Sequence, residues 1–118
     1  MESPQFEVNF IQVSQKSVAI TGRNCGATIR VGDVFDLVYH GTFIRDAEGQ
    51  CLEMLRSRER PVLLKVTGIK VYEQWSDDMS EGMTGRLYLA GTGGDDLRAF
   101  DFLTTKDLAT HGHPTNTV

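Results

Sequence analysis

Residues 20–33 read Ile20-Thr21-Gly22-Arg23-Asn24-Cys25-Gly26-Ala27-Thr28-Ile29-Arg30-Val31-Gly32-Asp33, and this stretch decides how the chain folds. It joins two short apolar pieces through Gly22 and Gly26, and a Gly-Asp pair then leads into the run 34–39. Glycine at this density breaks a helix, whereas a β-strand accepts it where the strand bends or turns. The stretch therefore predicts short strands joined by a tight corner.

Upstream of the corner, apolar residues recur with the two-residue period of a strand. Phe6, Val8 and Phe10 alternate, and the period then shifts to Ile11 and Val13. A period-two pattern that slips by one residue is typical of a β-bulge, here near Phe10-Ile11.

The longest strand signal runs from Pro61 to Trp75. Its apolar residues share one parity up to Val66 and take the other from Ile69, with Thr67-Gly68 at the switch. We expect a bulge there, in a backbone conformation that a side chain at Gly68 would strain. Further alternation at 87–90 and 97–103 brings the total to about seven glycine-punctuated strands, which predicts an all-β barrel.

The segment from His40 to Arg60 interrupts this pattern. Cys51, Leu52 and Leu55 are spaced as one face of a short helix, although an extended hairpin also fits. We expect a loop or short-helix excursion at about 40–60. Long insertions of this kind in compact domains are usually functional or flexible.

Two sets of motifs resemble the second, β-barrel domain of translation GTPases such as elongation factor Tu. The first is the Thr-Gly-Arg corner followed by Val31-Gly32-Asp33, and the second is Val66-Thr67-Gly68-Ile69 followed by Gly85-Arg86-Leu87-Tyr88-Leu89-Ala90-Gly91. The resemblance implies a closed six-stranded Greek-key barrel over residues 1–103, standing alone without a GTPase domain. Residues 104–118 lack an apolar period and are expected to form a flexible tail.

The chain also departs from that family. No Gly-x-x-x-x-Gly-Lys-Ser/Thr loop is present, so we expect no bound nucleotide. The family positions that hold the aminoacyl end of tRNA fall on Lys70 and Glu73, with the two charges exchanged. The resemblance therefore does not carry tRNA binding over to these residues.

Composition limits the classes of partner. The net charge is -4 and the pI is about 5.3, which disfavours a general nucleic-acid or anionic membrane surface. No apolar run is long enough to span a membrane, and the N-terminus does not resemble a signal peptide, so a cytoplasmic location is expected. Cys25 and Cys51 fit no metal motif; we expect two reduced thiols, with a single bridge left open.

Candidate catalytic and metal-binding groups are few. His111 and His113 lie in the polar tail, and His40 is expected at a strand rim. Cys25 would need a nearby base to act as a nucleophile, and a small buried packing residue is the favoured interpretation. The carboxylates around Asp77-Asp78 fit no calcium loop. The sequence thus predicts a protein without catalytic residues, metal or cofactor.

Two groups of side chains are candidate binding residues. On an extended segment three arginines would project to one side at period two: Arg56, Arg58 and Arg60. Near the end of the long strand lie four residues suited to anchoring a partner: Lys70, Tyr72, Glu73 and Trp75. For the aromatic pair, Tyr72 and Trp75, packing at the edge of the core is the alternative. We expect a non-enzymatic docking module for a protein partner, and the alternative is a translation-linked RNA- or tRNA-binding protein that uses residues 45–60.

Addition of GTP or GDP with magnesium is expected to leave the thermal unfolding temperature unchanged. A ligand that binds the folded state must raise that temperature by mass action, and the phosphate-binding loop is missing. Differential scanning fluorimetry measures the shift. A saturable rise with GTP would contradict the expectation.

Overall fold

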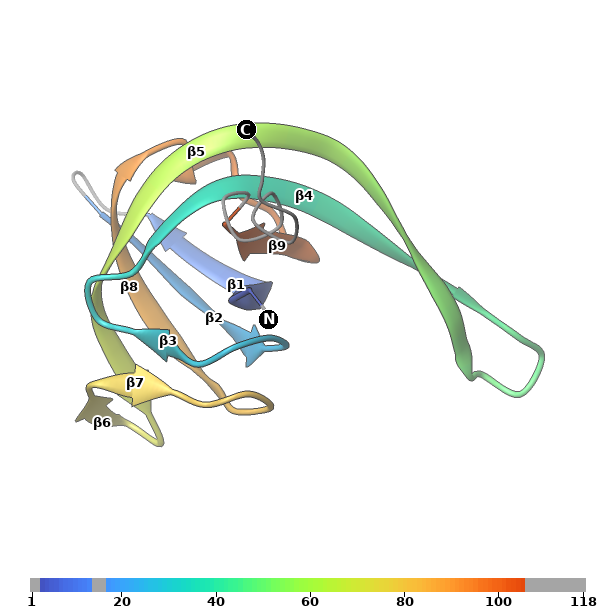
Figure 1. The fold of residues 1–118 in the computed structure, drawn as a ribbon, viewed down its shortest axis with the longest axis horizontal. Coiled ribbons are helices and arrows are strands. Elements are labelled where there is room, and N and C mark those ends of the chain that lie inside the picture. Colours follow the sequence, from blue (N-terminus) through green and yellow to red (C-terminus); the bar gives the residue numbers. More distant parts are fainter. Residues whose placement is uncertain (1–2, 14–16, 106–118) are drawn as a thin grey trace, which may run out of the picture.

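The strands expected from the alternation close into a ring (Figure 1). The computed structural model describes residues 3–13 and 17–105. Within them the elements are β1 (Gln5–Val13), β2 (Val18–Asn24), β3 (Ile29–Arg30), β4 (Val34–Arg45), β5 (Cys51–Val71), β6 (Gln74–Ser76), β7 (Asp78–Met79), β8 (Thr84–Thr92), the short 3-10 helix η1 (Gly94–Asp96) and β9 (Asp101–Thr104). No helix in the described ranges is long and apolar enough to cross a membrane.

Six strands form the ring in the order β4-β9-β1-β2-β8-β5, and β5 pairs back with β4. Every pairing is antiparallel. β2 pairs with β8 rather than with β4, the next barrel strand in the chain, which gives a Greek-key order. The predicted closed six-stranded barrel is therefore confirmed. β6 extends β5, and β3 pairs with β7 as a separate small sheet.

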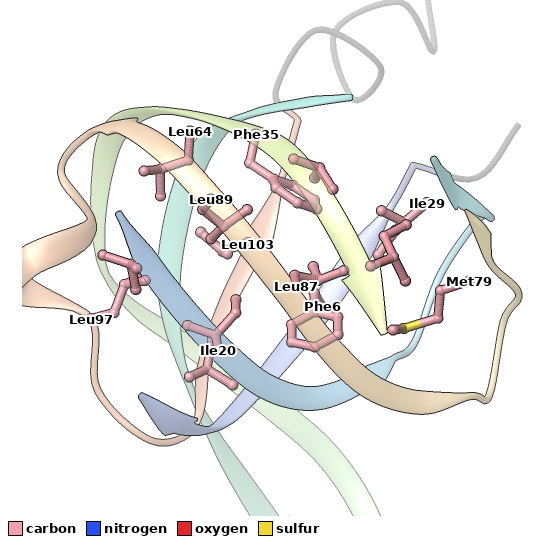
Figure 2. Close-up of a cluster of buried hydrophobic side chains, with 14 of the residues drawn as sticks. Phe6, Ile20, Ile29, Phe35, Leu64, Met79, Leu87, Leu89, Leu97 and Leu103 are labelled. Atoms are coloured by element: carbon pink, nitrogen blue, oxygen red, sulfur yellow. The ribbon is translucent and has the colours of Figure 1, made fainter. Parts of the chain in front are cut away.

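The core lies inside the ring, where all six barrel strands contribute buried side chains (Figure 2). Ile29 of β3 and Met79 of β7 are fully buried beneath the small sheet. Burying a large apolar side chain stabilises a fold by about 1.5–3 kcal/mol, so this shared interior is the main source of stability. The members that are almost completely buried include Phe6, Val8, Ile20, Phe35, Leu64, Val66, Ile69, Leu87, Leu89 and Leu103.

Both predicted bulges are present. The register of β1 against β2 shifts between Val8 and Phe10, slightly before the expected position, and that of β5 against β8 shifts between Val66 and Gly68. The expected backbone strain at Gly68 is wrong, because its φ lies outside the left-handed region. A Cβ on Gly68 would instead lie 3.0 Å from Cζ3 of Trp75, so the glycine leaves room for that ring.

The excursion at 40–60 is neither a loop nor a short helix. β4 and β5 continue past the barrel as a two-stranded ribbon, with Thr42 paired to Leu55 and Ile44 to Glu53 (Figure 1). The Asp46 carboxylate accepts backbone N–H groups of residues 48 and 50, which fixes the turn at the tip. The extended-hairpin alternative is thus the correct one, because cross-strand pairs and a local turn outweigh a weak helical spacing.

The final strand is shorter than the expected 97–103. η1 and a turn precede it, with Phe100 in a left-handed conformation (φ 70°), and β9 begins at Asp101. Thr104 is buried at its end and donates a hydrogen bond to the Pro4 carbonyl at 2.7 Å. Most of the tail expected over 104–118, including His111 and His113, lies outside the described residues.

Asn24 is a fully buried polar residue at the corner after β2. Its Nδ2 donates to the carbonyl oxygens of Ala27 at 3.0 Å and Met79 at 2.8 Å. Its Oδ1 accepts the N–H of Gly26 at 3.0 Å, and its backbone bonds to residues 82–83 at 2.7 and 2.9 Å. One residue therefore ties the corner to β7 and to the turn before β8.

Replacing Asn24 with Ala is expected to lower the free energy of unfolding by about 3–5 kcal/mol, because buried groups that lose a hydrogen-bond partner cost about 1–3 kcal/mol each. Urea denaturation measures the change. The control is Thr67→Ala, which removes an exposed hydroxyl that donates to the Tyr88 carbonyl at 3.1 Å and should cost less than about 1 kcal/mol. Equal midpoints for the two variants would contradict the role of Asn24.

Candidate functional site

The predicted binding residues form two separate groups along β5. The three arginines lie where the ribbon leaves the barrel, and the second group surrounds the turn into β6. Roughly 33 Å of extended strand separates Arg60 from Lys70, at about 3.3 Å per residue. The two groups are therefore distinct surfaces rather than one site.

The first surface is the projecting ribbon, defined as residues 41–45 of β4 and 51–62 of β5. β9 pairs with β4 only over Leu37–His40, and β8 pairs with β5 only from Leu63 onward. Within the described residues each ribbon strand thus has one neighbouring strand, and its other edge is open except at Gly41, whose N–H donates to the Phe100 carbonyl at 3.1 Å. Open edges present unpaired N–H and C=O groups to any extended segment that approaches.

The ribbon surface is mixed in character. Leu55 is 49% exposed and Ile44 37% exposed, which provides apolar contact area. Residues 41–60 hold four arginines and four carboxylates, so the segment carries no net charge despite its arginines. Nucleic acids are held mainly by an excess of cations, and this balance suits a protein better than RNA.

Arg56 covers an aromatic cluster on the outside of the barrel. Its guanidinium carbon lies 3.9 Å above the centroid of the Tyr39 ring, and its Nε lies 3.5 Å from Glu59. Tyr39 in turn stacks on Phe102 at 5.1 Å between centroids. Burial raises the pKa of Tyr39, with Arg56 opposing that rise. Part of the role of Arg56 is therefore structural.

The three arginines do not project to one side as expected. The register of β4 against β5 shifts between the pairs of Val38 and His40, and Arg58 adopts φ 54°. This bulge breaks the period of two. Arg56 stays over Tyr39, whereas Arg58 and Arg60 line a pocket at the barrel end.

The second surface is the aromatic turn, which consists of Lys70, Tyr72, Glu73 and Trp75. Val71 pairs with Gln74, and the two residues between them have φ of 55° and 64°, as in a type I′ hairpin turn. Non-glycine residues in this conformation cost about 1–3 kcal/mol each and persist most often at functional sites. Tyr72 is 87% exposed and Trp75 67% exposed, so the pair is not packed into the core.

The aromatic turn is held by local contacts. The Lys70 Nζ lies 4.8 Å from the centroid of the Trp75 ring, and that ring lies 5.3 Å from the ring of Tyr88. A shallow pocket of about 240 Å³ beside the turn is also lined by Arg86, whose pKa is raised by its hydrogen bond to the Tyr88 hydroxyl. These contacts preorganise an exposed aromatic patch that could bind a partner.

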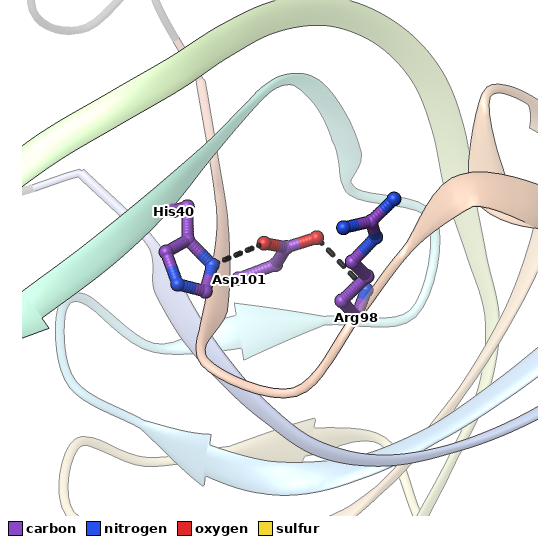
Figure 3. A network of polar contacts seen from close by, with 3 residues as sticks. All are labelled: His40, Arg98 and Asp101. Atoms are coloured by element: carbon purple, nitrogen blue, oxygen red, sulfur yellow. Dashed lines mark hydrogen bonds and ion pairs between the residues drawn. The ribbon is translucent and has the colours of Figure 1, made fainter.

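Among the described candidate groups, no nucleophile is paired with a base. Cys25 is exposed, so its expected burial is wrong; the corner points its side chain outward while Asn24 takes the buried position. Packing around the sulfur and the Glu7 carboxylate raise the pKa of Cys25. His40 Nδ1 lies 3.0 Å from Asp101 Oδ1 (Figure 3). Among the described residues no cluster of three or more His, Cys, Asp or Glu could hold a metal ion.

The comparison with solved structures supports the fold. Two crystal structures of translation elongation factor SelB from Methanococcus maripaludis, the apo form and the complex with the GTP analogue GppNHp, each match with a TM-score of 0.61 and 13% identity. Each match covers 89% of this chain and 19% of the SelB chain. No protein-family model and no curated protein matches. At this identity the likeness shows a translation-factor-like β-barrel fold and nothing further.

The thiol of Cys25 is expected to react more slowly with iodoacetamide at neutral pH in the folded protein than in urea. Only the thiolate is nucleophilic, and the raised pKa of Cys25 lowers the fraction of thiolate at neutral pH. Alkylation rates between pH 6 and 10 in a Cys51→Ser variant isolate this group. The unfolded variant in urea is the control, and a lower midpoint in the folded state would indicate an activated cysteine.

Proposed function

We propose that this chain is a non-enzymatic, cytoplasmic docking module whose projecting ribbon pairs with an extended segment of a protein partner. The observation that carries the proposal is the open edge of β5 over residues 51–62, where neither β8 nor β9 supplies a partner strand in the described structure. Backbone pairing along such an edge provides affinity, and the alternating side chains provide selectivity.

The composition of the ribbon supports a protein rather than RNA as the partner. The charges of residues 41–60 balance, and the exposed apolar side chains described on the ribbon include Ile44 and Leu55. Binding along an RNA backbone would require a row of cations on one face, and the bulge at Arg58 separates Arg56, over Tyr39, from Arg58 and Arg60 at the barrel end. RNA or tRNA binding through 45–60 is thus the less favoured alternative.

The aromatic turn supplies a second contact area. Exposed Tyr72 and Trp75 are residue types that dominate the energetics of many interfaces, and the left-handed turn fixes their positions. Lys70 and Glu73 flank them with opposite charges. We assign this surface a supporting role, because it is distant along β5 from the ribbon.

The likeness to a translation factor is consistent with a scaffold that presents surfaces without performing chemistry. The matched barrel corresponds to 19% of SelB. In this chain no nucleotide-binding loop accompanies the barrel. A link to translation itself follows only by analogy of fold, and the proposal does not depend on it.

Shortening the ribbon tests the docking surface directly. Thr42 and Leu55 pair across the ribbon, so an Asn-Gly turn can replace residues 43–54. This variant is expected to unfold as cooperatively as the parent but to capture at least about tenfold less partner from lysate, since a tenfold loss corresponds to about 1.4 kcal/mol of contact energy. The captured protein is then purified, and its affinity is measured for both forms.

Two further variants separate the alternatives. Loss of capture by Trp75→Ala with retention by the shortened ribbon would place docking on the aromatic turn instead. Micromolar binding of tRNA or ribosomal RNA at physiological salt, abolished when Arg56, Arg58 and Arg60 are all replaced by Ala, would contradict protein docking.

A further inference from the structure

A pocket of about 300 Å³ opens where the ribbon leaves the barrel, and half of its lining is arginine. The lining residues are Val38, Arg58, Arg60, Asp96, Arg98 and Asp101. Arg58 and Arg60 come from β5, and Arg98 comes from the turn between η1 and β9. Three like charges from two separate segments meet here in a chain whose net charge is -4. We call this feature the arginine pocket.

Arg60 has an unsatisfied donor in the arginine pocket. Its Nη1 donates to the Gly93 carbonyl at 3.0 Å, which fixes the guanidinium in place. Its Nη2 is buried and has no hydrogen-bond partner in the described structure. Buried polar atoms are nearly always paired, so an unpaired charged donor indicates that an acceptor is missing.

Arg58 reaches the arginine pocket through an unfavourable backbone conformation. Its φ of 54° is unusual for a residue other than glycine, and it lies within the bulge that shifts the β4–β5 register. Such outliers persist where the surrounding fold imposes them, and they cluster at ligand sites. The bulge therefore brings Arg58 into the lining of the pocket that Arg60 also lines.

The two carboxylates of the arginine pocket form no ion pair with its three arginines in the described structure. Asp101 accepts from the Arg98 backbone N–H at 2.9 Å through Oδ2, and its Oδ1 lies 3.0 Å from His40 (Figure 3). Both of its oxygens are thus engaged, and they hold the turn that carries Arg98. Across the described ranges no ion pair within 4.0 Å joins Asp96 or Asp101 to an arginine.

We propose that the arginine pocket binds a dianionic oxyanion of the phosphate type, either free or as the terminal group of a small phosphate ester. The planar guanidinium fork matches the oxygen spacing of phosphate, and two or three such forks suit a double charge better than a single carboxylate. A volume of about 300 Å³ exceeds the need of a bare ion and accommodates a small organic group. This site goes beyond the docking function and requires no protein partner.

Isothermal titration calorimetry at constant ionic strength tests the site with three probes. Inorganic phosphate is expected to bind saturably at one site, and acetate at least about tenfold more weakly, because a monoanion engages fewer charged donors. Glycerol phosphate distinguishes a phosphate ester from free phosphate as the ligand. If it binds more tightly than phosphate, the ligand is an ester, and if it binds more weakly, the ligand is the free ion. Absence of saturable binding by both phosphate probes would overturn the proposal.

Four variants assign the binding to these residues. Arg60→Gln and Arg98→Gln should each weaken phosphate binding at least about tenfold, and Asp96→Asn should tighten it by removing a like charge. Arg30→Gln, at an exposed arginine on β3, is the matched control and should bind as the parent does. Parent-like affinity for phosphate in both the Arg60 and the Arg98 variant would overturn the proposal. If one of them folds poorly, the other still provides the test.

The ribbon-shortened protein separates this site from the docking function. It retains Arg58, Arg60 and Arg98, because only residues 43–54 are replaced. It should therefore bind phosphate as the parent does while failing to capture the protein partner. Loss of phosphate binding in this variant, with its unfolding unchanged, would contradict the location of the oxyanion site.

Discussion

The barrel depends on one buried amide, the side chain of Asn24. A fully buried Asn is costly unless its donors and acceptor are paired, and here they bond to Ala27, Met79 and Gly26. These bonds fix the corner after β2 and attach β7, which lets the β3–β7 sheet cover one end of the core. In the described part of the chain no such sheet covers the other end, and there the ribbon and the arginine pocket occur.

A mismatch of strand length creates the candidate functional surfaces. β4 has 12 residues and β5 has 21, whereas β9 has 4 and β8 has 9. A barrel has no edges only where neighbouring strands are equally long, so the excess of β4 and β5 becomes a ribbon with two open edges. The bulge at Arg58 marks the transition, and it directs Arg58 and Arg60 to the barrel end while the rest of the ribbon continues outward. One irregularity therefore separates the proposed small-anion site from the proposed protein-docking surface.

The sequence predicts the barrel well because its signals are local. Alternation, the glycine corner and the switch at Thr67-Gly68 each reflect backbone requirements within a few residues. The sequence does not distinguish the ribbon from a short helix, since the spacing of Cys51 and Leu55 fits both. The arginine pocket was beyond sequence reasoning, because it requires Arg98, 38 residues after Arg60, to return beside it through a turn capped by Asp101. The exposure of Cys25 was likewise decided by its neighbour, whose side chain occupies the buried side of the corner.

Hydrogen–deuterium exchange tests the central claim most directly, namely that a protected barrel carries a ribbon whose edges are open. In the free protein, the outward-facing amides of residues 51–62 should exchange close to the rate of unstructured chain. Amides of β2 and β8 should exchange only through global unfolding. Addition of the purified partner should protect the ribbon alone. Ribbon amides that are already as protected as those of β2 in the free protein would contradict the account, because the edges would then be covered before any partner binds.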